Sequence, residues 1–357
     1  MGPPMKHYDA LALFSGGLDS ILAAKTVVDQ GLKVLCLHFV SPFFGHPDLL
    51  AHWKDVYDLD IIPVDVSEEF TAMLASGPDH GVGKVLNPCI DCKILMLGKA
   101  KTLLSEYGAE FLITGEVKGQ RPMSQRMDAL NIISRDAGVR GVLLRPLSAK
   151  KFDPTPMELA GVVDRERLHN IGGRGRKDQL ALANAYDLKE IPTPAGGCLL
   201  TEAESAKRYF PILKYFPQRD PNDFRLANIG RQYWAGRHWL AIGRNQADNT
   251  ALEQVLESRD LVFKTKGFPG PLAVGRQPAD GPWSETTVRD AAAFVASFSP
   301  KAVRSGQPIE VYVRVGHANH VVTITPSRET PLGWADPDWE TAKAEKSAFF
   351  AEAEGDD

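Results

Sequence analysis

The stretch Ala10–Gly31, ALALFSGGLDSILAAKTVVDQG, decides the fold of the N-terminal half of this chain. Ala10–Phe14 is a short apolar run typical of a buried parallel strand, and Ile21–Gln30 continues at helical spacing until a glycine ends it. Between them lies the turn Ser15–Ser20, SGGLDS, whose two glycines let backbone N–H groups approach a ligand closely. Because the next helix presents its positive dipole end there, the stretch predicts a strand, a phosphate-binding turn and a helix.

Further apolar runs predict the strands that complete a sheet. They are Lys33–Phe39, Asp60–Val66, Phe111–Thr114 and Val142–Leu144. Because helical segments separate them, the pattern predicts an α/β fold with a doubly wound parallel sheet. Phe39 ends its run at the carboxyl edge, where open α/β sheets bind ligands, so it is a candidate nucleotide contact. The segment Ser67–Leu86, with its glycines and proline, is expected to be a loop.

Composition indicates a folded protein with two domains. Hydrophobic residues make up 43% and charged residues 24% of the 357 residues, which are ordinary values for globular proteins. The sequence has neither an apolar run long enough to span a bilayer nor a signal peptide, so we expect no membrane contact and a cytoplasmic location. The stretch Tyr215–Pro221 predicts a linker between a first domain (1–215) and a smaller α+β domain (222–340), with an acidic tail (341–357).

The net charge of −4 argues against a uniformly basic nucleic-acid-binding protein, but basic residues are concentrated locally. Lys and Arg outnumber Asp and Glu by eight to four both in 144–177 and in 225–276. The candidate phosphate contacts in these regions are Arg174, Arg176 and Lys177 in a glycine loop, and Lys264 and Lys266 alternating along a predicted strand. Each alone is explained as a solvated surface charge, whereas together they predict RNA binding.

Three of the four cysteines form a separate pattern. Cys89 and Cys92 make a CxxC at the predicted start of a helix, with Asn87 as its N-cap, and Cys198 follows in a Gly-Gly turn. The dipole of that helix favours thiolate. Three cysteine ligands leave one metal coordination position without a protein ligand. This suits an iron-sulfur cluster, whereas structural zinc prefers four protein ligands. The alternatives are zinc completed by His80 or His169, a Cys89–Cys92 redox pair, and three unrelated cysteines.

The turn SGGLDS resembles the PP-loop of ATP pyrophosphatases, which cleave ATP between the α and β phosphates and adenylate a substrate. The runs LITGEVKGQRPMSQ (112–125) and LLRPLSAKK (143–151) resemble the PP-loop domain of the tRNA 4-thiouridine synthetases of the ThiI family. The resemblance implies that the ATP phosphates and Mg²⁺ are held by Ser15, Gly16, Gly17, Asp19 and Ser20, with Asp19 also catalytic. It implies that the nucleotide or uridine pocket is lined by Thr114, Gly115 and Gln120.

Relative to the better-known bacterial members, we expect this chain to lack both the N-terminal RNA-binding region and the C-terminal rhodanese domain. Its cysteines are instead similar to those of cluster-dependent tRNA thiolases, in which a CxxC and one later cysteine hold a 4Fe-4S cluster. This similarity implies that Cys89, Cys92 and Cys198 are both metal ligands and catalytic residues.

The C-terminal half has a second resemblance. The fragments Ile242–Asn245, Asn249, DLVFKTKGFPG (260–270) and AAAFVASFS (291–299) resemble the NFACT-R domain, an RNA-binding module of ribosome-associated proteins. This resemblance adds Arg244 to the candidate RNA contacts. Where that family has a tryptophan and a histidine after the aspartate, this chain has the run 262–264, Val-Phe-Lys, so its RNA contacts differ.

Together these features predict a tRNA sulfurtransferase. It would use ATP to adenylate a uridine carbonyl oxygen and replace that oxygen with sulfur, forming 4-thiouridine with sulfur from sulfide or a cysteine desulfurase. Two other classes of protein fit parts of the pattern. One is a PP-loop ligase or amidase that acts on a small molecule, and the other is a non-catalytic, ribosome-associated RNA-binding protein.

Overall fold

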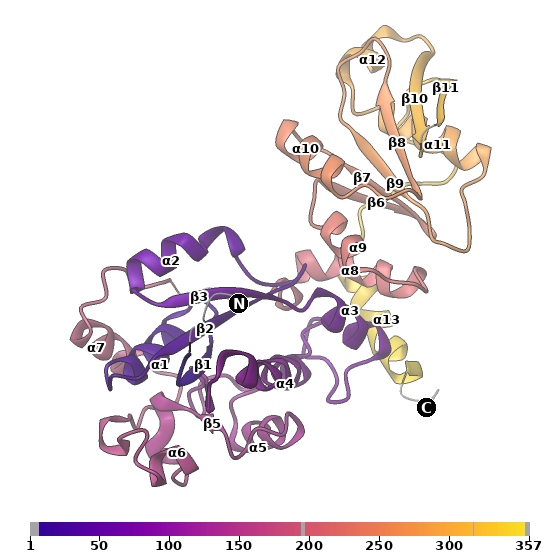
Figure 1. Ribbon diagram of the computed structural model, residues 1–357. Coiled ribbons are helices and arrows are strands. Elements are labelled where there is room, and N and C mark those ends of the chain that lie inside the picture. The colour runs from indigo at the N-terminus through magenta and orange to yellow at the C-terminus, as the bar shows by residue number, and fades with distance from the viewer. Residues whose placement is uncertain (1–6, 194–196, 317, 354–357) are drawn as a thin grey trace. The chain divides into compact units, whose positions relative to one another are not determined.

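The computed structural model describes residues 7–193, 197–316 and 318–353, and the chain divides between Thr201 and Glu202 into two compact units (Figure 1). The division lies before the linker expected at Tyr215–Pro221, so that stretch belongs to the second unit. Residues 194–196 of the predicted Gly-Gly turn and residues 354–357 of the expected acidic tail lie outside the described residues.

The first unit is built on a parallel five-stranded sheet, as the sequence predicts. Its strands are β1 (Ala10–Leu13), β2 (Val34–Val40), β3 (Asp60–Asp65), β4 (Phe111–Ile113) and β5 (Leu143–Leu144). Their order is β3-β2-β1-β4-β5, and all neighbours are parallel. The chain therefore builds outward from β1 first on one side and then on the other. The switch point between β1 and β4 is where sheets of this kind bind ligands.

Helices cover both faces of this sheet. The α-helices are α1 (Leu18–Val28), α2 (Leu50–Tyr57), α3 (Ser67–Ser76), α4 (Cys89–Tyr107), α5 (Met127–Asp136), α6 (Pro156–Leu159) and α7 (Lys177–Ala185). The 3₁₀ helices are η1 (Pro47–Leu49), η2 (Pro146–Lys151), η3 (Arg165–Arg167) and η4 (Leu199–Thr201). Along β1, Ala10 and Ala12 join the core beneath α1, whereas Leu11 and Leu13 join the core with α4 and α5. This alternation confirms the doubly wound α/β fold.

Two local expectations in this unit were wrong. The first half of the expected loop Ser67–Leu86 is helix α3, because Phe70 and Leu74 lie four residues apart and are both fully buried. Helix α4 begins at Cys89 with Pro88 as its N-cap. Asn87 does not cap the helix, since its side-chain amide donates a hydrogen bond to the Sγ atom of Cys89 over 3.2 Å.

The second unit contains an antiparallel six-stranded sheet. Its strands are β6 (Arg231–Ala235), β7 (His238–Ile242), β8 (Asp260–Thr265), β9 (Ala273–Arg276), β10 (Ile309–Val315) and β11 (Ala318–Ile324), in the order β11-β10-β8-β9-β7-β6. Its helices are α8 (Ala203–Tyr215), α9 (Pro221–Ala227), α10 (Gln246–Gln254), α11 (Glu285–Ala296), α12 (Pro300–Ser305) and α13 (Trp339–Ala353). Aromatic and alanine side chains of α11 pack on one face of the sheet.

The expected linker and the expected tail both contribute packed structure to this unit. Phe216 is 1% exposed, and its ring lies 5.7 Å from that of Trp239. Much of the tail forms α13, which packs against α8 through the rings of Phe210 and Phe349 and an ion pair of 2.9 Å between Lys214 and Glu345. Among the residues that the structure describes, no helix is long and apolar enough to cross a membrane.

A buried ion-pair network connects the strands and helices of the second unit. Arg276 is fully buried on β9 and pairs with Asp260 of β8 at 2.8 Å, with Asp223 at 3.0 Å and with Glu257 at 3.1 Å. Arg259 pairs with Asp223 as well, at 2.6 Å. Removing the central guanidinium would leave carboxylates buried without their main partner.

We therefore predict that Arg276→Met destabilises the second unit by about 3–5 kcal/mol, the cost of breaking a buried ion pair from one side. Tryptophan fluorescence during denaturant unfolding measures this, because five of the six tryptophans lie after residue 201. Arg237→Met is the matched control, since its pair with Asp280 is exposed and is worth about 0–1 kcal/mol. Equal effects of the two substitutions would show that the network does not hold the unit together.

Candidate active site

The turn after β1 is shaped by glycine and by the aromatic side chains beneath it. Gly16 has φ +74°, and a Cβ atom there would lie 2.4 Å from the indole of Trp53, so no other residue fits. Gly17 occupies the N-cap position of α1. Ser20 Oγ donates to the Gly17 carbonyl over 2.7 Å and accepts from the Ser15 N–H over 3.2 Å. The turn is thus folded back on the first turn of α1, which places it at the positive dipole end of that helix.

His38, to which the sequence gave no role, supports this turn from below. Its Nε2 accepts a hydrogen bond from the His46 N–H over 2.8 Å, so Nδ1 carries the proton and donates to the Phe14 carbonyl over 3.0 Å. Burial lowers the pKa of His38, which favours this neutral form. Phe39 lies next to it, but its ring is 5% exposed and packs in the hydrophobic core.

The loop after β4 touches the start of α1. Gly115 directly follows this strand and Thr114, and a Cβ atom at Gly115 would lie 2.5 Å from the Asp19 carbonyl oxygen. Gln120 Nε2 donates a hydrogen bond to Asp19 Oδ2 over 2.9 Å. The structure therefore brings together Gly115, Gln120 and the phosphate turn, which are about a hundred residues apart in the sequence.

The carboxyl group of Asp19 is buried and only partly paired. Burial raises its pKa, although hydrogen bonds from Gln120 and Gln179 and the charges of Arg176 and Arg121 favour the ionised form. Its Oδ1 atom is buried and has no hydrogen-bond partner among the described residues. An unpartnered carboxylate oxygen beside a phosphate-binding turn fits Mg²⁺, which proteins usually bind through one or two carboxylates together with substrate phosphates.

Glu116 and Arg145 form a second buried pair at this site, which sequence reasoning missed. Their side chains are 2% and 10% exposed, and Arg145 Nε donates to Glu116 Oε2 over 2.9 Å. Thr114 Oγ1 donates to the same oxygen over 3.1 Å. Although burial raises the pKa of Glu116, the charges of Arg145 and Lys93 and these hydrogen bonds outweigh it and lower the pKa. The sequence did contain a signal for this pair, because the motif fragment TGE carries the acidic Glu116 and the fragment LRPL carries the basic Arg145.

The basic glycine loop, residues 172–177, lies beside the predicted phosphate-binding turn, residues 15–20, which is called the phosphate turn. The Gly173 N–H donates to the Lys118 carbonyl over 2.8 Å, and the charge of Arg176 acts on Asp19. Just after the loop, Gln179 is fully buried on α7, with its Nε2 3.4 Å from Gln120 Oε1. Of the three predicted phosphate contacts here, Arg174 and Lys177 are exposed and Arg176 is half-buried near the carboxylate. Sequence spacing gave no signal for Gln179, because its partners come from distant segments.

The three cysteines come together at the start of α4. Backbone hydrogen bonds hold the segment of Cys198 there, from the Leu199 N–H to the Phe43 carbonyl and from the Leu86 N–H to the Leu200 carbonyl. Burial raises the pKa of the Cys92 thiol, and the neighbouring Cys198 and Cys89 raise it further. The expectation that the helix dipole produces a thiolate is therefore wrong for Cys92, because burial outweighs it.

The three thiols have the chemistry of metal ligands but are not arranged as a metal site in the described part of the chain. Three sulfur donors suit iron or zinc chemically, and binding would ionise the thiols. In the described part of the chain, however, no group of three or more His, Cys, Asp or Glu side chains is arranged to hold a metal ion. The histidines considered for zinc are engaged elsewhere. His80 contacts Asp91 at 2.8 Å and Asp136 at 3.4 Å, and His169 Nε2 lies 3.1 Å from Thr26 Oγ1.

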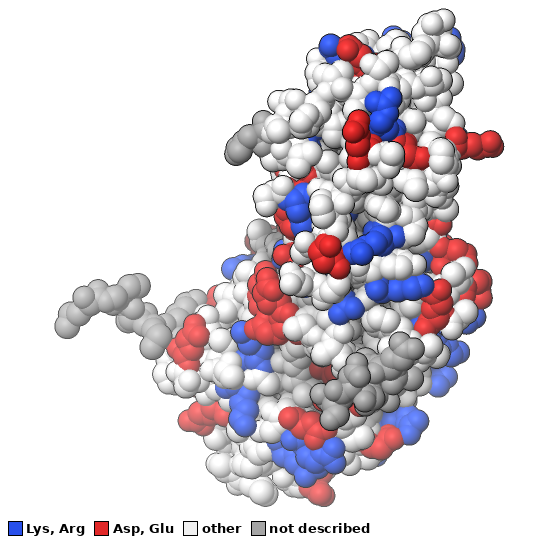
Figure 2. Space-filling model, turned by 90° about the vertical axis from the view of Figure 1, so that its right-hand side faces the viewer, with Lys and Arg blue, Asp and Glu red and all other residues white. Residues whose placement is uncertain are grey.

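The candidate RNA residues of the second unit are dispersed. Lys266 pairs with Glu310 at 2.7 Å, and Arg244 pairs with Asp248 at 2.7 Å. Lys264 lies on β8 next to Phe263, whose side chain is in the core beneath α11, so Lys264 is directed to the opposite face of the sheet. On the face drawn in Figure 2, Lys and Arg side chains are interspersed with Asp and Glu and do not form one continuous basic area.

Comparison with known proteins links the first unit to tRNA thiolation. Residues 6–153 match the family model described as "Thiamine biosynthesis protein (ThiI)". A tRNA sulfurtransferase of Desulfurococcus amylolyticus is 30% identical over 146 residues, which are 39% of this chain and 29% of that protein. One of Blochmanniella pennsylvanica is 31% identical over 149 residues, 40% of this chain and 29% of that protein. The chain thus spans less than a third of the length of these relatives.

A second kind of relative has a name that states a different activity. The tRNA-specific 2-thiouridylase MnmA of Nitratidesulfovibrio vulgaris is 35% identical over 109 residues, which are 28% of this chain and 31% of that protein. The chain is therefore similar over part of its length to enzymes that thiolate tRNA, and the family match over residues 6–153 includes the turn, the loop after β4 and the Glu116–Arg145 pair.

We predict that Gly115→Ala loosens the first unit, because its methyl group would meet the backbone of Asp19, which cannot rotate away. The expected cost is about 1–3 kcal/mol, as for other overpacked sites. Hydrogen exchange of the β1 and β4 amides measures this loss of stability within the first unit. Gly98→Ala on α4 is the control, because nothing lies within 4 Å of the added atom. Unchanged protection in Gly115→Ala would mean that the two loops can separate freely.

Proposed function

We propose that this chain is an ATP-dependent tRNA sulfurtransferase that forms 4-thiouridine. The observation that carries the proposal is the convergence of the phosphate turn, Gly115, Gln120 and the unpartnered Asp19 Oδ1 at the switch point of the sheet. This convergence lies in the segment that matches the ThiI family. The resemblance of residues 112–125 and 143–151 to the 4-thiouridine synthetases favours position 4 of the uridine over position 2.

In the proposed reaction the first unit binds ATP along the turn between β1 and α1. The N–H groups around Gly17 and the dipole of α1 would hold the phosphates, and Asp19 would hold Mg²⁺. The uridine carbonyl oxygen attacks the α-phosphorus, and pyrophosphate leaves. Sulfur at the oxidation level of sulfide, as HS⁻, then adds to the activated carbon, and AMP departs with the oxygen, which leaves a carbon–sulfur double bond. The protein contributes chiefly by orienting these groups and by neutralising phosphate charge.

The buried polar groups around Asp19 would keep it in place for this task. Gln120 donates to one carboxylate oxygen and Gln179 Nε2 lies 3.4 Å from Gln120 Oε1, so both amides would restrain the carboxylate of Asp19. The Glu116–Arg145 pair ties the loop after β4 to the loop after β5, and thereby fixes Gly115 against α1. These are positioning residues.

We assign the sulfur-transfer step to Cys89, Cys92 and Cys198, which would hold a 4Fe-4S cluster. When bound, such a cluster supplies an iron atom with an open position for incoming sulfur. The chain's own part would be to bring the three partly exposed cysteines together at the end of α4 that carries Lys93, whose charge also acts on Glu116. Zinc is the alternative metal, and sulfide or a cysteine desulfurase would be the sulfur donor.

The second unit would hold the tRNA, in keeping with its resemblance to the NFACT-R domain. Its candidate contacts are Arg244, Lys264 and Lys266, and those of the first unit are Arg174, Arg176 and Lys177. RNA affinity of this kind depends on neutralising phosphates and falls steeply with salt.

The decisive measurement is AMP formation from ATP with and without unmodified tRNA. We predict that AMP appears only with tRNA, and that Asp19→Asn lowers its rate by a factor of about a hundred or more, because the site loses a charge on the phosphates and the metal. Binding of tRNA by this variant should be unchanged. Asp29→Asn, at the exposed far end of the same helix, is the matched control.

Each other outcome has a defined meaning. AMP formation without tRNA would identify a ligase for a small molecule. Binding of tRNA with no AMP at all would identify a non-catalytic RNA-binding protein. Full activity in Asp19→Asn would reject the phosphate turn as the ATP site.

For the metal, we predict that strictly anaerobic protein contains iron and sulfide and absorbs broadly in the visible range. Alanine at Cys89, Cys92 or Cys198 should abolish both the iron content and the absorption. Cys36→Ala should preserve both, because Cys36 is fully buried in the core of the first unit and would lose only packing. Stoichiometric zinc without iron would reject the cluster.

A further inference from the structure

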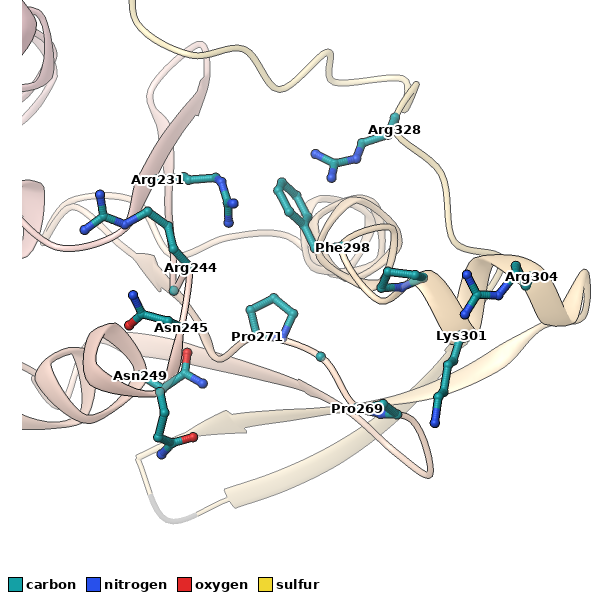
Figure 3. Close-up of a pocket in the computed structure, with 14 residues that line it drawn as sticks. Arg231, Arg244, Asn245, Asn249, Pro269, Pro271, Phe298, Lys301, Arg304 and Arg328 are labelled. Atoms are coloured by element: carbon teal, nitrogen blue, oxygen red, sulfur yellow. The ribbon is translucent and has the colours of Figure 1, made fainter.

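A cavity of about 600 Å³ lies in the second unit, away from the site described above (Figure 3). Its lining comes from five separate segments: the start of β6, the β7–α10 connection, the loop 269–271, the junction of α11 with α12, and Arg328 after β11. A volume of this size accommodates a single nucleotide-sized ligand. Several of these segments carry the NFACT-R resemblance, but the sequence alone does not show that they surround one cavity.

Hydrogen bonds between these segments fix the walls of the cavity. Ser299 is fully buried, and its Oγ donates to the Pro269 carbonyl over 2.5 Å. On the other side, the Gly243 N–H donates to the Leu272 carbonyl over 3.0 Å, and Asn249 Oδ1 accepts from the Leu272 N–H over 3.2 Å. The loop 269–271 is thus held at both ends, so the cavity is formed before any ligand arrives.

The lining is strongly basic. Its charged residues are Arg231, Arg244, Lys301, Arg304 and Arg328, and it contains no Asp or Glu. Asp248 neutralises Arg244 through hydrogen bonds of 2.7 and 3.2 Å. None of the other four forms an ion pair with a carboxylate in the described part of the chain. Four unneutralised cations around one cavity, in a protein of net charge −4, indicate an anionic ligand.

One wall also offers a flat surface. The guanidinium carbon of Arg328 lies 3.4 Å from the ring centroid of Phe298, and that of Arg231 lies 5.8 Å from the same centroid. In Figure 3 both guanidinium groups extend toward this ring. A guanidinium stacked on an aromatic ring presents its outer face to a further planar group, and RNA bases stack on such planes.

We propose that this cavity binds one unpaired nucleotide of an RNA, with the base against the Arg328–Phe298 stack and the adjoining phosphates on Lys301 and Arg304. The choice of RNA rests on the proposed function, whereas the anionic and planar character of the ligand rests on the cavity alone. A duplex does not fit, because its bases are not accessible to a concave site of this size. The lysines of β8 lie on a different surface, on the face of the sheet away from α11.

The test measures binding of full-length protein, without ATP, to a blunt RNA hairpin and to the same hairpin with an unpaired extension of about five nucleotides. The parent should prefer the extended hairpin. Lys301→Ala/Arg304→Ala should weaken that binding about tenfold or more, and should reduce the slope of log affinity against log salt by about 1.4, the share of two single-strand phosphate contacts. Arg328→Lys keeps the positive charge but removes the planar guanidinium group. It should therefore lower the preference for the extended hairpin about fivefold or more, with little change in the slope of log affinity against log salt.

Arg237→Ala/Arg314→Ala is the matched control, because it also removes two exposed cations from the second unit and neither residue lines the cavity. All substituted residues are exposed, and unfolding midpoints equal to that of the parent verify that each variant is folded. The proposal is overturned if the control weakens binding as much as the cavity variant, if both hairpins bind equally, or if poly-glutamate displaces the RNA equally well at the same charge concentration. The last result would identify a site for acidic polypeptides.

The same experiment separates this proposal from the proposed function. If RNA binding depends on the cavity but no AMP is ever formed, the sulfurtransferase assignment fails and the cavity assignment stands. If AMP formation requires tRNA but the cavity variants bind RNA like the parent, only the cavity assignment fails.

Discussion

The first unit depends on the contact between two backbones at the switch point of its sheet. Gly115 approaches the first turn of α1 so closely that a single methyl group would meet the Asp19 carbonyl oxygen at 2.5 Å. This approach follows from placing β1 and β4 side by side, and it sets Gln120 beside the carboxylate of Asp19. The phosphate turn, the loop after β4 and the basic glycine loop form one site because this contact holds them together.

Two buried carboxylates at this site have opposite electrostatic surroundings. Glu116 has its own guanidinium partner, which holds its pKa below the ordinary value despite burial. Asp19 has amide partners and more distant charges, so burial prevails and its pKa is raised. The first carboxylate is ion-paired within the fold and connects two loops, although its Oε1 atom is also buried without a hydrogen-bond partner among the described residues. The second carboxylate, Asp19, has an oxygen without a hydrogen-bond partner among the described residues. A cation that arrives with the ligand would supply the positive partner that the fold does not provide.

Local sequence signals were sufficient for the elements whose determinants lie close together along the chain. The apolar run before Ser15, the two glycines and the helix after them predict the turn, and similar runs predict every strand of the parallel sheet. Long-range partners were not predictable in this way. Nothing in the sequence around Gln179 indicates that it packs behind Gln120, and the helix α3 was missed because glycines farther along outweighed its two buried apolar residues. Likewise, Cys198, which helps to raise the pKa of the Cys92 thiol, lies more than a hundred residues farther along the chain.

The two anion sites differ in the source of their positive charge. The turn of the first unit relies on fixed backbone N–H groups and a helix dipole next to a carboxylate, which suits a compact phosphate chain that arrives with its own cation. The cavity of the second unit relies on lysine and arginine side chains, four of which form no ion pair within the described part of the chain, and this suits a polymer whose condensed counterions are released on binding. Screening by salt therefore weakens the second site far more than the first. A protein of net negative charge can hold RNA under these conditions only where such cations are concentrated, and the cavity concentrates them around a surface that also selects for a planar base.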